Sequence, residues 1–218
     1  MRMRKKKNLP ARMECCASVL VSEPESRRGH WLEGHEKCTR LFVELGCGKG
    51  RFTVGTAQAE RDALIVAVEK VPDAMVIAME RTVAAELDNV LFIDADAARL
   101  TELFAPGEVE RIYINFCDPW PPKNRAKRRL THTGFLKLYR ELLPEGGEIW
   151  FKTDNVPLFD FSLEEFTANG FELRELTRDL HENGVQGIMT DYEAKFHEAG
   201  TRINRVVAVK RALPEGEA

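Results

Sequence analysis

Acidic residues stand at the ends of five short apolar runs in this chain. Each run is rich in β-branched or aromatic residues, which is typical of a buried strand. The carboxyl ends of parallel strands meet at one edge of a sheet, where ligands bind. We therefore expect these carboxylates to surround one site. They are Glu44, Glu69, Asp96, Asp118 and Asp154.

A glycine-rich loop, ELGCGKG at 44–50, follows the first run and precedes a helical pattern. Glycines at such a position let the backbone approach a ligand. A dinucleotide fingerprint would place its third glycine at position 51, but that residue is Arg51. The loop therefore favours NAD less than a ligand with a cationic end, which Glu44 would attract.

The other carboxylates narrow the choice of cofactor. Glu69 lies 19 residues after Gly50, a suitable distance for accepting hydrogen bonds from ribose hydroxyls, and Asp96 could reach the exocyclic amine of an adenine. S-adenosylmethionine has an ammonium, a sulfonium, a ribose and an adenine but no phosphate, so it is the predicted cofactor. A tight turn without a ligand is the alternative. The residues expected to bind the cofactor are Glu44, Gly46, Gly48, Glu69 and Asp96.

The stretch NFCDPWPPKNRAKRRL, residues 115–130, places a stiff aromatic turn directly before a basic run. Two X–Pro steps and a Pro-Pro pair restrict the backbone, which holds Asp118 and Trp120 in place. A rigid ring beside a carboxylate can stack on a nucleic-acid base and accept hydrogen bonds from its Watson–Crick edge. The alternative is a proline-rich turn whose tryptophan fills the core.

The basic residues are concentrated in two segments, although the net charge of the chain is only −3. Residues 1–12 hold six basic side chains and no acid, and residues 119–140 hold seven and no acid. Two positive patches on an otherwise acidic protein suggest a localised anionic partner such as nucleic acid. A merely solvated charged face is the alternative.

The order of apolar runs and helical patterns predicts the fold that positions these residues. Strands alternate with helices, which predicts an α/β protein with a doubly wound, mostly parallel, seven-stranded sheet and helices on both faces. The expected strands are 41–46, 63–69, 89–96, 111–118, 147–154, 171–177 and 202–211. Helices are expected after residue 50 and at 72–88, 97–104, 131–143, 157–170 and 192–198.

The length of 218 residues suits one α/β domain. We expect a basic N-terminal arm and irregular lead-in at 1–38, a catalytic domain at 39–213 and a short tail at 214–218. No apolar run approaches the length of a membrane span, and no secretory apolar core follows the basic N-terminus. These features predict a cytoplasmic protein. The five cysteines show neither disulfide nor metal-ligand spacing, so no metal is expected.

Seven segments, spread over nearly the whole chain, resemble the bacterial tRNA (guanine-N7-)-methyltransferase family. They are MRMRKKK, RRGHW at 27–31, VELGCGKGRF at 43–52, VEK at 68–70, the stretch at 115–130, FKTDN at 151–155 and TDYEAKF at 190–196. The DPWP-then-KRRL and T-x-Y-E elements are the most specific. The resemblance implies a Rossmann-like class I methyltransferase that methylates a guanosine in the tRNA variable loop.

The resemblance also implies residue roles. Asp118 would be the catalytic residue and would contact the cofactor together with Glu44, Glu69 and Asp96. The substrate guanosine would be held by Asp154, Thr190, Asp191, Tyr192 and Glu193. Pro122 replaces a family lysine that contacts substrate, and Lys123 is the nearest candidate to supply that charge. Phosphates of the tRNA would be bound by Arg125, Lys127, Arg128 and Arg129, with the N-terminal arm as a second contact.

Other interpretations remain open. The chain could methylate another RNA or a protein, or it could be an inactive RNA-binding module of the same fold. The intact set of strand-end carboxylates argues against loss of activity. An NAD-dependent oxidoreductase is disfavoured by Arg51. The partner expected from these features is tRNA, bound by a monomer or homodimer.

Overall fold

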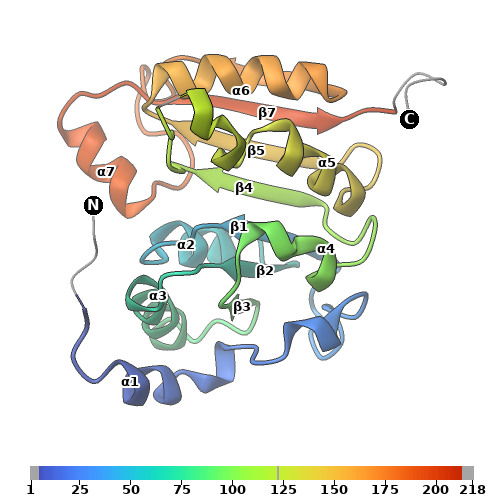
Figure 1. Ribbon diagram of the computed structural model, residues 1–218. Coiled ribbons are helices and arrows are strands. Elements are labelled where there is room, and N and C mark those ends of the chain that lie inside the picture. Colours follow the sequence, from blue (N-terminus) through green and yellow to red (C-terminus); the bar gives the residue numbers. More distant parts are fainter. Residues whose placement is uncertain (1–4, 122, 213–218) are drawn as a thin grey trace.

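Seven strands form one sheet at the centre of the computed structural model, which describes residues 5–121 and 123–212 (Figure 1). The strands are β1 (Arg40–Leu45), β2 (Ala63–Val68), β3 (Val90–Ile93), β4 (Arg111–Asn115), β5 (Glu148–Thr153), β6 (Phe171–Thr177) and β7 (Asn204–Lys210). Their order is β3-β2-β1-β4-β5-β7-β6, and β7 is antiparallel to both of its neighbours. The predicted α/β fold is confirmed.

The strand order reverses between β1 and β4, which are paired in parallel. In doubly wound sheets this switch point is where ligands bind, beyond the carboxyl ends of the strands. Figure 1 shows β4 pointing toward the side on which α7 lies, while β7 runs the opposite way. A site at the switch point can therefore be reached by residues that follow β1, β2, β4 and β5.

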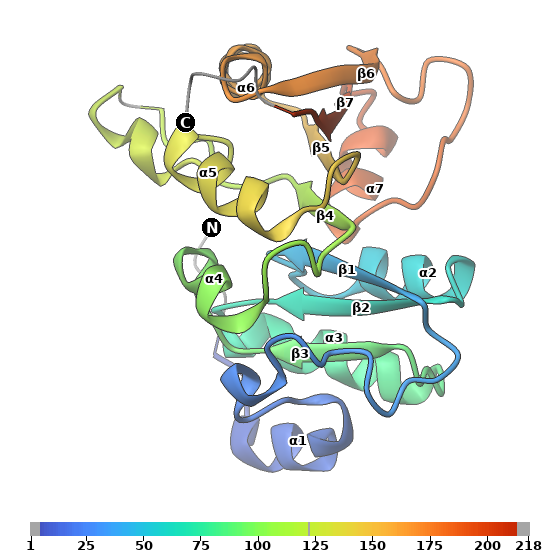
Figure 2. The ribbon, with the colours of Figure 1, turned by 90° about the vertical axis from the view of Figure 1, so that its right-hand side faces the viewer.

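Helices lie on both faces of the sheet (Figure 2). The longer helices are α2 (Arg51–Ala59), α3 (Pro72–Ala84), α5 (Thr133–Leu142), α6 (Val156–Ala168) and α7 (Asp191–Glu198). The shorter ones are α1 (Leu9–Cys15), η1 (Ala17–Val19), η2 (Pro24–Arg27), η3 (Ala97–Arg99), α4 (Leu100–Leu103) and η4 (Lys123–Arg128).

Alternating strand residues divide the apolar interior into two clusters, one on each face of the sheet. Phe42 packs with α2 and α3, whereas Val43 packs with α4, α5 and α6. Trp31, from the segment before β1, is fully buried in the second of these clusters, and its indole N–H donates to the carbonyl of Leu103 at 2.9 Å. The segment before β1 therefore contributes to the core.

The expected strands all occur, but two of them end three residues earlier than predicted. β3 ends at Ile93 and β4 ends at Asn115. Asp96 and Asp118 consequently lie in the loops beyond these strands and not at their last positions. A loop residue is not bound to the in-and-out alternation of a strand, and both carboxylates line the same cavity.

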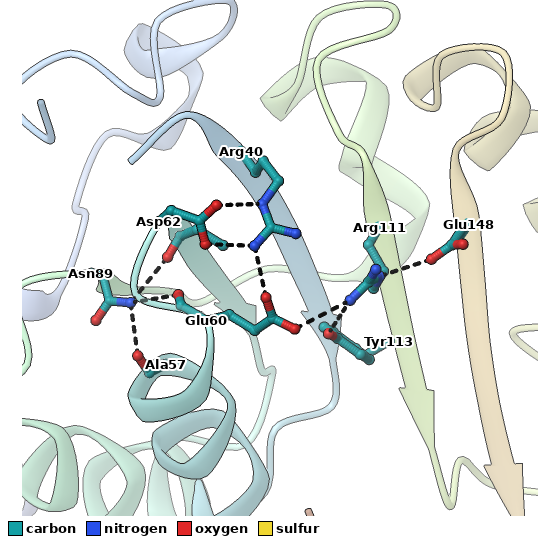
Figure 3. Close-up of polar contacts among 9 residues, drawn as sticks. Arg40, Ala57, Glu60, Asp62, Asn89, Arg111, Tyr113 and Glu148 are labelled. Carbon is teal, nitrogen blue, oxygen red and sulfur yellow. Dashed lines mark hydrogen bonds and ion pairs between the residues drawn. The ribbon is translucent and has the colours of Figure 1, made fainter. Parts of the chain in front are cut away.

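A network of charged residues joins the amino ends of β1, β4 and β5, away from the switch point (Figure 3). Arg40 pairs with Asp62 and also, at 2.7 Å, with Glu60. Arg111 lies 3.7 Å from Glu60 and 3.0 Å from Glu148. These bridges cross-link neighbouring strands at the end of the sheet that carries no candidate site.

No helix within the described ranges is long and apolar enough to cross a membrane.

Candidate active site

A cavity of about 580 Å³ opens at the carboxyl ends of β1, β2 and β4, a size within the range of roughly 300–1,000 Å³ that is usual for small-molecule sites. It brings together seven residues of interest: Gly46, Glu69, Asp96, Asp118, Trp120, Lys127 and Arg128. Residues from four separate parts of the sequence thus meet at the switch point. Glu44 and Gly48 are not part of the described lining.

The three loop glycines have different structural roles. Gly46, Gly48 and Gly50 all adopt the left-handed backbone, with φ of 79°, 56° and 78°. A Cβ atom at Gly46 or Gly48 would meet nothing within 4 Å, whereas one at Gly50 would lie 2.7 Å from the Cα of Ala78. Gly50 therefore allows α2 and α3 to pack closely, and Gly46 leaves space beside the cavity.

Glu69 is held at the cavity wall by backbone amides. Its Oε2 accepts from the N–H of Gly48 and its Oε1 from the N–H of Val71, both at 3.0 Å. A carboxylate oxygen has a further lone pair, so each can still accept from a ligand hydroxyl. Gly48 thereby contributes by orienting Glu69.

Asp96 has two local partners and also lines the cavity. Its Oδ1 caps η3 by accepting from the N–H of Ala98 at 3.0 Å, and its Oδ2 lies 3.5 Å from Nζ of Lys70. The cap is the common role of an acid at a strand end. The side chain is half-exposed, which leaves it accessible to a ligand.

The turn that follows β4 is held in a strained conformation. Phe116 and Trp120 adopt left-handed φ of 53° and 42°, which costs of order 1–3 kcal/mol for each residue. Arg129 stabilises the turn because Nε donates to the carbonyl of Pro119 at 2.9 Å and Nη2 to that of Trp120 at 3.2 Å. Its guanidinium also lies over the ring of Phe161. Arg129 thus positions the turn, and its predicted phosphate contact stays a prediction.

Asp118 lies in this turn, is exposed, and lines the cavity with Trp120. Cys117 precedes it, and burial raises the pKa of its thiol to about 12. Cys117 therefore stays protonated at neutral pH and does not supply a nucleophile. Asp118 is the only charged side chain of the DPWPP turn.

The basic run forms one rim of the cavity. Lys127 and Arg128 line it, and the guanidinium of Arg128 lies 4.9 Å from the centre of the Trp120 ring. Arg125 lies 6.0 Å from the same ring, outside the described lining. Pro122 and the side chain of Lys123 lie outside the described part of the chain. The predicted substrate contact at Lys123 therefore stays a prediction.

Glu44 lies beneath the glycine loop, 1% exposed, and Oε2 accepts from the hydroxyl of Thr53 at 2.5 Å. Burial raises the pKa of Glu44 to about 7, against the opposing effects of Thr53 and Lys152. Its predicted contact with the cofactor is neither supported nor contradicted by this placement. At neutral pH a large fraction of Glu44 is protonated.

A pH dependence of stability follows from Glu44. The pKa of Glu44 is raised from 4.5 to about 7 in the folded protein. The protonated carboxyl therefore contributes fully to the unfolding free energy below pH 4.5, and this contribution is lost as the pH rises through 7. Between these values the unfolding free energy of the wild type should fall, relative to Glu44→Gln, by about 3 kcal/mol. Urea unfolding of both proteins at pH 5 and pH 8 would measure this, and parallel pH profiles would contradict it.

The four residues predicted to hold the substrate guanosine from the start of α7 have different environments. Thr190 and Glu193 form a capping box at the start of this helix. Asp191 pairs with Arg81 at 2.7 Å. Tyr192 is 47% exposed, and its ring centre lies 5.3 Å from that of Phe116. Of these four residues, Tyr192 has the side chain with the most exposed surface.

Asp154 follows β5 and lies near Tyr192, since the pKa of Tyr192 is raised by burial and by the Asp154 charge. Neither residue is part of the described cavity lining. Tyr192 borders it through Phe116, which touches both Tyr192 and the cavity. Of the predicted guanosine contacts, Tyr192 thus lies beside the predicted cofactor cavity.

Three residues of this region were given no role from the sequence. Asn115 lines the cavity, is 8% exposed, and has no hydrogen-bond partner for Nδ2 among the described residues. Phe116 joins the cavity to Tyr192, and Lys152 is a buried lysine at the end of β5. The period-two alternation of β4 and β5 could have placed Asn115 and Lys152 on one face, since these residues are aligned in the sheet.

The residues lining the cavity fit the cofactor predicted from the sequence. The ligand would need room, acceptors for a ribose, and a negative environment for its cationic centre. The space at Gly46, the fixed oxygens of Glu69 and the carboxylates of Asp96 and Asp118 provide these. Among the described residues no cluster of His, Cys, Asp and Glu could hold a metal ion.

Comparisons with known proteins agree with this fold. The family model Methyltransf_4, described as "Putative methyltransferase", matches residues 39–206. The antibiotic-resistance methyltransferase Kmr has a similar structure, with a TM-score of 0.59, 21% identity, and coverage of 86% of this chain and 94% of that chain. A 16S rRNA (adenine(1408)-N(1))-methyltransferase variant from Catenulisporales acidiphilia, solved with the cosubstrate SAM, has a TM-score of 0.59 and 14% identity, covering 91% of this chain and 95% of that chain. The fold is that of a Rossmann-like class I methyltransferase.

Proposed function

This chain belongs to the family of the tRNA (guanine-N7-)-methyltransferases, and we propose that it transfers a methyl group from S-adenosylmethionine to N7 of a guanosine in the variable loop of tRNA. The observation that carries the proposal is the position of Asp118. This carboxylate lies in a rigid turn at the wall of the cavity, next to Trp120 and directly before the basic rim.

The cavity residues would hold the cofactor along the switch point. Glu69 would accept from the ribose hydroxyls, Asp96 would lie at the adenine end, and Gly46 would let the backbone approach. When bound, S-adenosylmethionine supplies an electrophilic methyl group on a sulfonium.

Asp118 would act mainly through its charge. N7 of guanine has a free lone pair, so its methylation requires no prior deprotonation and no strong general base. Methylation places positive charge on the purine, which a fixed carboxylate stabilises. The strained turn keeps Asp118 in place, and Trp120 and the Phe116–Tyr192 pair provide aromatic surfaces beside it. Such surfaces favour a base that has left its stack.

Basic residues border the cavity on two sides and would bind the phosphates of the tRNA. Lys127 and Arg128 form the rim after β4. On the other side Lys70 lines the cavity, and the backbone N–H of Lys6 donates to Asp73 in the first turn of α3. The basic N-terminal segment therefore runs close to the rim formed by Lys70, which supports its predicted role as a second contact with tRNA.

The decisive experiment is a product analysis. Purified protein would be incubated with S-adenosylmethionine and unmodified tRNA, and the digested nucleosides would be identified by mass spectrometry. We expect 7-methylguanosine. A different methylated nucleoside, or methylation of ribosomal RNA or protein supplied in its place, would support the alternative substrates. Absence of any methylated product would support an inactive RNA-binding module.

Phosphate binding by the basic rim predicts a change in salt dependence. Replacing Arg125 and Lys127 with glutamine should raise the dissociation constant for tRNA. It should also make the plot of the logarithm of the association constant against the logarithm of salt concentration less steep, by roughly 0.7–0.9 for each phosphate that is no longer neutralised. The control is Lys37→Gln. Lys37 lies just before β1, at the end of the sheet opposite the cavity, where it pairs with Asp88. Fluorescence anisotropy over a salt series would measure both quantities, and an unchanged slope would argue against the assignment.

A further inference from the structure

We infer that Glu193 is a positioning residue whose buried ion pair with Lys152 fixes the start of α7 and so sets Tyr192 against Phe116 beside the methyl-transfer site. This inference rests on the proposed function, because it concerns how the substrate base is received. The inference gives two residues of the T-x-Y-E element different roles: Tyr192 would contact the base, whereas Glu193 would act through its neighbours.

The contacts of Glu193 occupy both oxygens of its carboxylate, and the residue is 0% exposed. Oε2 accepts from Nζ of Lys152 at 2.6 Å and from the N–H of Thr190 at 3.1 Å. Oε1 lies 3.0 Å from Nε2 of His181. A substrate base could reach this carboxylate only after α7 had moved away.

His181 has a defined tautomer in this arrangement. Its Nδ1 accepts from the N–H of Gln186 at 3.2 Å, so the ring proton of the neutral imidazole lies on Nε2 and is donated to Glu193. Lys152 also donates to the carbonyl of Ile188 at 3.0 Å. The ion pair and its partners thus hold the loop between β6 and α7 at three points.

Lys152 joins α7 to the strained turn after β4. Its side chain binds Glu193, while its backbone carbonyl accepts from the N–H of Phe116 at 2.9 Å. Phe116 in turn lies two positions before Asp118, and its ring packs at a tilt against that of Tyr192. One residue of β5 therefore contacts Phe116 directly and Tyr192 through its neighbour Glu193.

Buried charges make this arrangement sensitive to the loss of one partner. Burial lowers the pKa of Lys152, whereas Glu193 acts in the opposite direction. Removing one member of a buried pair leaves an uncompensated charge, whereas removing both members avoids that cost. Coupling between Lys152 and Glu193 should therefore be strong if the pair positions α7, and absent if the two residues act on the reaction independently.

A double-mutant cycle tests this point with Glu193→Gln, Lys152→Met and the double variant. We expect each single substitution to lower kcat/KM for tRNA on the order of tenfold to a hundredfold, because small misplacements of substrate-positioning groups have effects of this size. The double variant should lose much less than the product of the single losses. Glu198→Gln, on the exposed last turn of α7, is the matched control and should match the wild type. Multiplicative losses in the cycle would overturn the inference.

A second cycle identifies Tyr192 as the residue that is positioned. The double variant Tyr192→Ala, Glu193→Gln should lose no more kcat/KM for tRNA than Tyr192→Ala alone. Losses in kcat/KM that multiply would contradict the inference. Amide hydrogen exchange gives a readout without turnover. The amides of residues 190–194 should exchange at least tenfold faster in Glu193→Gln, with an unchanged dissociation constant for S-adenosylmethionine, and unchanged exchange at these amides would also contradict it.

If Glu193→Gln does not fold, His181→Gln serves for the same measurements, since it weakens the support of Glu193 without removing the ion pair. Its expected result is the same in direction and smaller in size, and wild-type exchange at residues 190–194 would contradict the inference. If the wild type forms no 7-methylguanosine, the proposed function fails. If the wild type is active but both cycles are multiplicative, only the present inference fails.

Discussion

Replacing Asp118 with alanine is expected to lower the single-turnover rate of methyl transfer to tRNA by about 100- to 1,000-fold, the usual effect of removing one electrostatic group that stabilises a transition state. The carboxylate lines the cavity within a turn fixed by Arg129 and two prolines, so no neighbouring acid of that turn can replace it. Affinity for tRNA should stay nearly the same, because phosphate contacts dominate it. Rapid-quench kinetics and anisotropy would measure the two quantities.

Two further variants separate the charge of Asp118 from its shape. Asp118→Asn keeps the shape but removes the charge and should lose nearly as much activity as alanine. Asp94→Ala is the matched control, because Asp94 is exposed after β3 and outside the described lining of the cavity. Near-normal transfer by Asp118→Asn would show that the residue orients the reactants and does not stabilise charge.

Replacing Gly50 with alanine is expected to destabilise the fold by about 3 kcal/mol, because overpacking of a core contact and strain at a left-handed residue both contribute. The new Cβ would lie 2.7 Å from the Cα of Ala78, a backbone atom of α3 that cannot move without shifting the helix. Urea unfolding would measure the loss, and the midpoint should fall without a change in slope.

Gly146→Ala is the control for Gly50→Ala. Gly146 has a φ of 81°, close to the 78° of Gly50, but a Cβ there would meet nothing within 4 Å. Gly146→Ala should therefore lower the unfolding free energy only by the strain of the left-handed backbone, about 1–2 kcal/mol. Equal losses at the two positions would show that the close approach of α2 and α3 has no energetic effect.

The sequence was sufficient to predict the sheet because β2 and β3 are apolar throughout and each of the other strands carries several apolar residues. All six residues of β2 are buried, and such a run is distinctive in any alternating α/β pattern. The glycine loop and the DPWPP turn were also evident, since both depend on residues whose backbone preferences are local. Gly46, Glu69, Asp96 and Asp118 lie around one cavity, in the loops that follow the carboxyl ends of β1, β2, β3 and β4.

Side-chain partners at long range could not be predicted in this way. Glu193 belongs to a specific motif, yet its burial depends on Lys152, which is 41 positions away in the chain. Arg129 belongs to a basic run, yet its guanidinium turns back to the carbonyls of the proline-rich turn. Composition gives the charge of such residues, whereas tertiary packing decides whether the charge faces a partner molecule or the protein itself.

The position of β7 has a consequence for synthesis of the protein. β7 enters the sheet between β5 and β6, both of which precede it in the chain, and β6 pairs with β7 alone. While β7 is still inside the ribosome, β5 and β6 expose unpaired edges, which are sites for aggregation. Pairing of β6 and completion of the sheet at this side therefore require residues 204–210, which makes β7 the last strand that the sheet can receive.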